Sequence, residues 1–250
     1  MEEENVKKEG KKSKKKVIII IVLIVIVLFL AIVGFIFYHG NQAGKLIAEV
    51  NKISEIQMVD ENGNMIEEPL DMEIKTTGSY AIVEKTLKDY MNEIVTSTKE
   101  LAETLDEEKV MNLVSFDNIK EDGPDFVKTK EEIAKMKETI NNYVSKMEEL
   151  ANEEKLLSRI DDKDVGEYYK ELYKKLAVDE ESGASMRAAV EELKLAQEDA
   201  KTVLEDLESI FNFLSENKDG WQIEGEQIVF TTQSAYDEYA NLMSTLETMQ

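Results

Sequence analysis

Few side chains in this sequence could carry out catalysis or bind a metal. The 250 residues include no cysteine and one histidine, His39. The missing thiol excludes disulfides, thiolate nucleophiles, zinc–cysteine sites, iron–sulfur clusters and lipidation on an amino-terminal cysteine. The sequence also has no glycine-rich phosphate loop and no G-x-S-x-G elbow. We therefore expect a protein without a cofactor that is not an enzyme.

Carboxylates are abundant, with 53 acidic side chains against 30 basic ones and a formal net charge of −23. Acid–base catalysis needs an apolar pocket that separates the pKa values of two carboxyls, and no pair stands out. Residues 60–64 resemble the start of a calcium loop, but Met65 stands where glycine is required, so we interpret them as a turn, with weak calcium binding as the alternative. Residues 161–166 have Lys163 and Val165 at ligand positions and are rejected. We expect no metal site, and the acidic charge argues against nucleic acid as a partner.

Aromatic residues could form a contact surface, because aromatic side chains anchor many binding interfaces. One set of seven aromatic residues in the last third of the chain is a candidate for a partner or ligand surface. The alternative is that these rings pack one end of a helical bundle. The candidate residues are Trp221, Phe230, Tyr236, Tyr239, Tyr168, Tyr169 and Tyr173.

A membrane anchor precedes all of these residues. Residues 17–38 contain no charge, and as a helix they would span roughly 33 Å, which matches a hydrocarbon core of about 30 Å. Seven lysines precede the segment, so the positive-inside rule places residues 1–16 in the cytoplasm and residues 39–250 outside. The alternative is a cleaved signal peptide, although its apolar region is usually shorter. The bilayer is thus the first expected partner.

The outer region, residues 39–250, carries most of the acidic charge and is predicted to be helical. Its net charge is −26, whereas the basic segment 1–16 carries +3. Apolar residues recur at spacings of three and four, which predicts helices at about 41–58, 79–105, 164–177 and 184–217, with an extension to Val114 as an alternative end of the second helix. Gly123 and Pro124 interrupt the pattern.

Two segments show heptad spacing, which is typical of supercoiled helices with interlocking side chains. The breaks between helices predict an all-α fold, an elongated antiparallel bundle within one chain, monomeric in its outer domain. The first segment has Ile133, Met136, Ile140, Tyr143, Met147 and Leu150, and the second has Met186, Val190, Leu193, Gln197, Ala200, Leu204, Leu207, Phe211 and Leu214.

The last fifth of the chain departs from this pattern. Residues 221–230 favour a small β-hairpin that turns at Gly225, and Thr232 or Ser234 can cap a final helix. The order of Trp221, the turn, residues 228–232 and the tyrosines of the final helix resembles the carboxy-terminal segment of certain bacterial membrane-anchored helical proteins of unassigned function. The resemblance covers about 30 residues. Members of that group are often lipoproteins, whereas this chain lacks the cysteine of a lipobox. The resemblance implies a helical domain at the cell envelope and no catalytic residues.

These observations leave three classes of function. We favour a membrane-tethered interaction or structural protein of the bacterial cell envelope, with an envelope protein as its partner. The alternative is a domain that senses or binds a ligand or an ion and signals through a membrane partner, since the 16 residues inside the cell cannot form an output domain. A hydrolase is the least favoured class, because it needs a carboxylate pair buried in a pocket.

Overall fold

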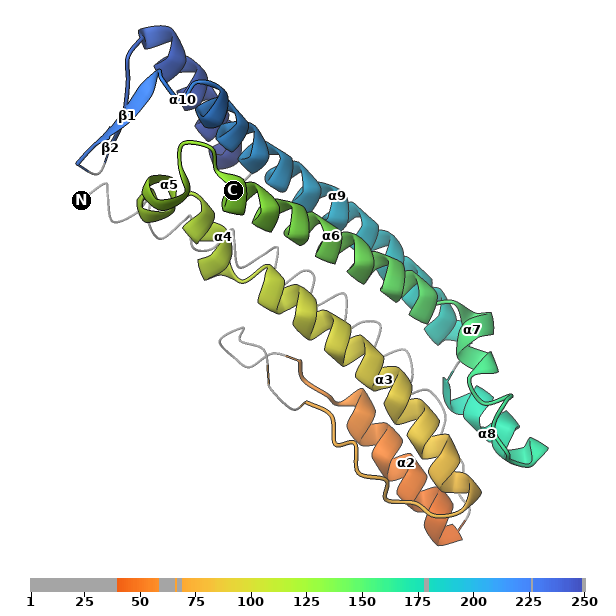
Figure 1. Cartoon of the computed structure of the whole chain (residues 1–250). Helices are drawn as coiled ribbons and strands as arrows, with labels where there is room; N and C mark the ends of the chain where they lie inside the picture. Colours follow the sequence, from red (N-terminus) through yellow and green to blue (C-terminus); the bar gives the residue numbers. More distant parts are fainter. Residues whose placement is uncertain (1–39, 59–65, 67–68, 178–179, 226, 249–250) are drawn as a thin grey trace, which may run out of the picture. The chain divides into compact units, whose positions relative to one another are not determined.

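The computed structural model describes residues 40–58, 66, 69–177, 180–225 and 227–248 (Figure 1). This part of the chain is mostly helical and has one two-stranded antiparallel sheet near its end, as predicted. Within these ranges no helix combines the length and the apolar character needed to cross a bilayer. The predicted membrane span 17–38, the basic segment 1–16 and the turn at 60–64 lie outside the described residues.

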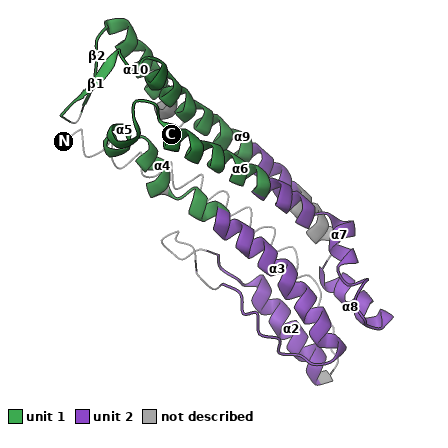
Figure 2. Ribbon diagram, in the orientation of Figure 1, with its two compact units in different colours: residues 1–14, 101–142, 196–250 green, residues 15–100, 143–195 purple. Residues whose placement is uncertain are grey.

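The chain divides into two compact units, coloured in Figure 2. Unit 1 contains residues 1–14, 101–142 and 196–250, and unit 2 contains residues 15–100 and 143–195. The elements in chain order are α2 (Gly40–Ser54), α3 (Ser79–Thr104), α4 (Glu107–Leu113), α5 (Phe116–Asp122), α6 (Val127–Leu150), α7 (Glu153–Ser158), α8 (Glu167–Ala177), α9 (Glu180–Glu216), β1 (Trp221–Glu224), β2 (Gln227–Phe230) and α10 (Gln233–Thr248).

The helix predicted from residue 79 does not continue to Val114. It ends at Thr104, and the side chain of Asp106 then accepts hydrogen bonds from the backbone N–H groups of Glu108 and Lys109, which starts α4. Ser115 caps α5 in the same way. The short helix α7, which begins after the cap Asn152, was not predicted, because six residues are too few to show a repeated helical spacing of apolar side chains.

In unit 2, helices α2 and α3 run parallel and side by side (Figure 1). The Lys88 ammonium of α3 contacts the Glu49 carboxylate of α2 at 2.7 Å, and Thr77, just before α3, donates its N–H to Gln42 in the first turn of α2. Neighbouring helices were predicted to run antiparallel. Helices α2 and α3 run parallel instead, because the connection of residues 55–78 is long enough for the chain to return to the end where α2 begins. The last part of this return, residues 69–78, is called the return segment below.

The heptad residues of α6 are buried, as predicted. In unit 2 the end of α6 runs antiparallel to α3: the Tyr90 hydroxyl donates to the Leu150 carbonyl, and the Thr98 and Tyr143 hydroxyls lie 3.3 Å apart. The side chains of Val190 and Leu193 on α9 are buried in the same unit. The core of unit 2 is thus built from the predicted seams together with α2 and α8.

In unit 1, helices α6 and α9 run antiparallel. The Lys130 ammonium donates to the Ser215 hydroxyl, and Lys137 pairs with Glu208 at 2.5 Å. Phe126, the residue just before α6, is fully buried and contacts Phe211 of α9, with ring centroids 5.1 Å apart. Of the heptad side chains that α9 contributes to unit 1, Leu204, Leu207, Phe211 and Leu214 are buried, whereas Gln197 and Ala200 are half-buried.

The predicted hairpin is present. Strands β1 and β2 pair antiparallel, with Trp221 opposite Phe230, and Gly225 takes the left-handed φ of +63° that a tight turn requires. The Thr232 hydroxyl accepts the N–H of Ala235 at 3.2 Å, so of the two predicted caps it is Thr232 that starts α10.

Candidate functional site

The seven predicted contact residues fall into two groups in different units. Trp221, Phe230, Tyr236 and Tyr239 belong to unit 1 and are called the hairpin aromatic group. The other three, Tyr168, Tyr169 and Tyr173, belong to α8 in unit 2. The structure therefore gives two separate candidate surfaces, each of which is described within its own unit.

Phe230 organises the hairpin aromatic group. Its ring lies 6.2 Å from that of Phe213 on α9 and 5.1 Å from that of Tyr239 on α10, so β2 packs between the two helices. The ring of Tyr236 lies 6.4 Å from Phe230, but 52% of this residue is exposed. Burial raises the pKa of Tyr239. Tyr236 is thus the member of the group that an outside partner could contact.

Trp221 packs on residues outside the hairpin and α10. Its ring stacks on Phe126, 6.1 Å away, and its indole N–H donates to the Leu214 carbonyl at 2.8 Å. The opposite ring, Phe230 on β2, contacts Tyr236 and Tyr239 on α10, so the two strands present their rings to different neighbours. Trp221 is half-buried and its one polar hydrogen has a partner, so its contacts fasten the hairpin to α9.

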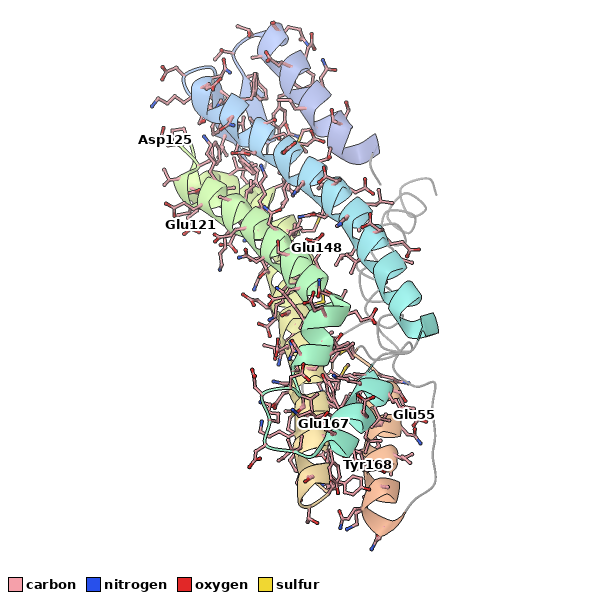
Figure 3. The ribbon with its side chains drawn as sticks, turned by 90° about the vertical axis from the view of Figure 1, so that its right-hand side faces the viewer. Glu55, Glu121, Asp125, Glu148, Glu167 and Tyr168 are labelled. Carbon is pink, nitrogen blue, oxygen red and sulfur yellow. The ribbon has the colours of Figure 1, made fainter. Side chains whose placement is uncertain are left out.

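In unit 2, Tyr80, Tyr168 and Tyr169 form a group that is called the tyrosine cluster. Tyr169 contacts Tyr80 at the start of α3 and Tyr168 beside it, both edge to face, at 5.0 and 5.2 Å between centroids. Burial and a hydrogen bond with Tyr168 raise the pKa of Tyr80. Tyr168 is 57% exposed and lies beside Glu167 in the first turn of α8 (Figure 3).

Tyr173 is part of the core instead. Its side chain is fully buried, and its hydroxyl donates to the Leu156 carbonyl at 2.9 Å. Burial raises the pKa of this phenol well above its usual range, so it stays protonated and keeps that hydrogen bond. We therefore assign Tyr173 to packing and leave Tyr168 and Tyr169 as surface candidates.

The most unusual chemistry in the described residues was not predicted. Lys88, Glu49 and Glu84 form a buried ion cluster in unit 2, with 1%, 5% and 1% of their side chains exposed. The Lys88 ammonium lies 2.7 Å from the Glu49 carboxylate and 2.9 Å from that of Glu84. One signal was visible, because Glu84 and Lys88 are four residues apart on one helix. Glu49 could not be linked to them without knowing the course of the return segment.

The buried ion cluster also holds the return segment. The Glu84 carboxylate accepts the backbone N–H groups of Lys75 and Thr76 and the Thr76 hydroxyl, at 2.7–3.1 Å. Lys88 completes its contacts by donating to the Glu73 carbonyl at 2.7 Å. Two buried carboxylates and one ammonium are thus bonded to each other and to the backbone, the arrangement in which buried charges are tolerated.

The electrostatics of the buried ion cluster favour the charged forms. Burial acts to raise the pKa of Glu49, but hydrogen bonds from Lys52 and Lys88 outweigh it, and the pKa is lowered. The pKa of Glu84 is also lowered, because backbone and Lys88 hydrogen bonds outweigh burial. Hydrogen bonds to both carboxylates raise the pKa of Lys88 against the effect of burial. A nucleophilic lysine needs a lowered pKa, so this geometry suits structure rather than covalent catalysis.

A second ionic group lies on the surface of unit 2. Arg159 donates to both carboxylate oxygens of Glu93, at 2.7 and 3.1 Å, and Lys146 contacts the same carboxylate at 2.8 Å. The Arg159 guanidinium also lies 5.1 Å from the centre of the Tyr90 ring. The hydrogen bonds from Arg159, against the effect of burial, lower the pKa of Glu93 to about 2.

The cavity described in unit 2 has little room for a small ligand, and the described residues do not gather around a metal position. An apolar cavity between α2, α3 and α8 has a volume of about 10 Å³, enough for about one water molecule. It is lined by Val50, Ile53, Leu87, Tyr90, Met91 and Ala177. Among the residues with described positions, no three potential metal ligands gather at one point.

Comparison of the chain with protein-family models, with curated proteins and with solved structures finds no match. The functional argument therefore depends on the residues and their geometry.

Proposed function

We propose that this protein is a membrane-tethered helical domain of the bacterial cell envelope that acts through contacts with other molecules, as an interaction or structural protein without catalysis. The domain is a helical bundle that faces outward from the cell. One observation carries the proposal: 22 uncharged residues, 17–38, follow a segment with seven lysines and lead into an acidic region.

The start of the described helices supports a tether. Helix α2 begins at Gly40, two residues after the predicted span ends at Tyr38. A backbone link of this length reaches at most about 7 Å. The bundle would therefore be held directly at the membrane surface, as suits a protein that presents a fixed surface there.

The arrangement of the charged groups supports a non-catalytic role. The members of the buried ion cluster use their hydrogen bonds on each other and on the return segment. Glu93 is likewise occupied by Arg159 and Lys146. These groups stabilise the fold of unit 2, whereas the exposed aromatic rings of Tyr168 and Tyr236 are available for contacts with partners.

The orientation is tested by adding protease to intact cells after removal of any wall. We expect residues 39–250 to be digested while an epitope tag on residues 1–16 remains intact. A cytoplasmic protein serves as the control for cell integrity. Protection of the helical domain in intact cells, with digestion after lysis, would overturn the orientation and the envelope location with it.

A further inference from the structure

The tyrosine cluster lies at the end of unit 2 where the chain would leave the membrane. Gln42, in the first turn of α2, accepts a hydrogen bond from the Thr77 N–H at 3.0 Å, so α2 and α3 start at the same end. Tyr80 is the second residue of α3 and contacts Tyr169 in the first turn of α8. Figure 1 shows the first residues of α2 and α3 together at this end.

Helix α8 runs in the same direction as α2 and α3. Its last residue, Ala177, lines the small apolar cavity together with Val50 of α2 and Leu87 of α3, whereas its first turn contacts the start of α3. Three helices therefore begin near one end of unit 2, and the tyrosine cluster joins the beginnings of two of them. Gly40, where the tether enters, is the first residue of the third.

We infer that the tyrosine cluster, through the exposed ring of Tyr168, rests on the headgroup layer of the lipid bilayer that anchors the chain. This inference rests on the proposed membrane tether. The three tyrosines of the cluster belong to the first turns of α3 and α8, and the first turn of α2 contacts Thr77 just before α3, so the cluster lies about one helical turn, roughly 5 Å, from the start of α2. The headgroup layer is about 5–8 Å thick on each side of the bilayer, and tyrosine rings are enriched there because they have an apolar body and a polar hydroxyl.

The charges around Tyr168 define the kind of lipid surface that fits. Glu167 beside it is exposed, and the preceding loop exposes Asp162 and Asp164 against the single Lys163, so the acidic side chains outnumber the basic one and would repel an anionic surface. Lys170 and Lys174 bond to Asp161 and are occupied. The contact therefore depends on aromatic rings, suits a mainly zwitterionic headgroup layer and is insensitive to salt.

The absence of cysteine from the sequence allows a direct test on the full chain. A fluorophore is attached at Ser79→Cys, at the start of α3, or at Glu100→Cys, an exposed site about 30 Å further along the same helix. Each protein is reconstituted into phosphatidylcholine vesicles that contain a lipid with a nitroxide quencher on its headgroup. We expect quenching several-fold stronger at residue 79 than at residue 100, and unchanged by added salt.

The decisive variant is Tyr168→Ser on the Ser79→Cys background. Because Tyr168 is largely exposed, its removal leaves the core intact, which circular dichroism checks. We expect quenching at residue 79 to fall by about half or more toward the value at residue 100. Unchanged quenching after Tyr168→Ser, or equal quenching at residues 79 and 100 in the parent proteins, would overturn the contact while leaving the tether in place. Failure of the full chain to stay with the vesicles at alkaline pH would instead overturn the tether.

Discussion

The residue with the largest expected effect on stability is Lys88, because two buried carboxylates depend on it. Lys88→Met removes the ammonium and leaves Glu49 and Glu84 together without their shared partner. Breaking a buried ion pair in this way costs about 3–5 kcal/mol. We expect that loss in the free energy of unfolding, measured by urea denaturation of residues 40–250.

Lys85→Met provides the matched control for this change. Lys85 lies on the same helix and pairs with Asp89, but both side chains are largely exposed. An exposed pair four residues apart on a helix contributes about 0.3–0.5 kcal/mol. Equal losses for the two variants would show that Lys88 is not buried among charges.

Glu93 is expected to make stability depend on pH. Its pKa is about 2 in the folded protein, against an ordinary value of 4.5, because Arg159 binds the charged form. A carboxylate with a lowered pKa stabilises the folded protein at pH values above the pKa that the group has in the unfolded chain. This contribution is lost as the pH falls from about 4.5 toward 2. Glu93→Gln should therefore flatten the dependence of the free energy of unfolding on pH in that window, while Glu100→Gln on the exposed side of α3 should leave it unchanged.

At the scale of elements, the turn between α5 and α6 requires glycine at position 123. A Cβ atom there would lie 2.5 Å from the Ile119 carbonyl oxygen and 3.3 Å from the Trp221 ring. Gly123→Ala should thus cost about 1–3 kcal/mol by overpacking. A Cβ atom at Gly44 in α2 would meet no atom within 4 Å, so Gly44→Ala should instead stabilise the protein by about 0.5–1 kcal/mol. The midpoint temperature of thermal unfolding should therefore fall for Gly123→Ala and rise for Gly44→Ala.

The hairpin should depend on Trp221. Its contacts with Phe126 and the Leu214 carbonyl fasten β1 to the rest of unit 1. Trp221→Ala should lower the free energy of unfolding by about 3 kcal/mol, as large-to-small changes of aromatic residues do. Tyr236→Ala, at the exposed edge of the hairpin aromatic group, should cost less than half as much. An unchanged stability for Trp221→Ala would indicate that the hairpin does not dock.

The elements that could be predicted are those whose signal is local. Ile133, Met136 and Ile140 mark the buried side of α6 by spacing alone, and Gly225 marks the hairpin turn. The partners of Trp221 and the direction of α2 beside α3 could not be predicted in the same way. The direction of α2 depends on where a long connection returns, and the bonds of Glu84 to residues 75 and 76 fix that return. Trp221 stacks on Phe126, which lies far from it in the sequence. Such contacts between distant residues leave no periodic pattern in the sequence.

At the scale of the whole molecule, burial of the heptad residues predicts how the chain associates. Coiled-coil seams that pair between chains would remain exposed within one copy, whereas Met136, Tyr143, Met147, Val190, Leu193, Leu204, Leu207, Phe211 and Leu214 are all buried in this single chain. Since these nine seam side chains are already covered within one copy, residues 40–250 should remain monomeric over a wide concentration range. Light scattering coupled to size-exclusion chromatography measures this directly. A dimer that persists on dilution would mean that the seams are satisfied between copies, and the buried side chains of α6 and α9 would then belong to an interface.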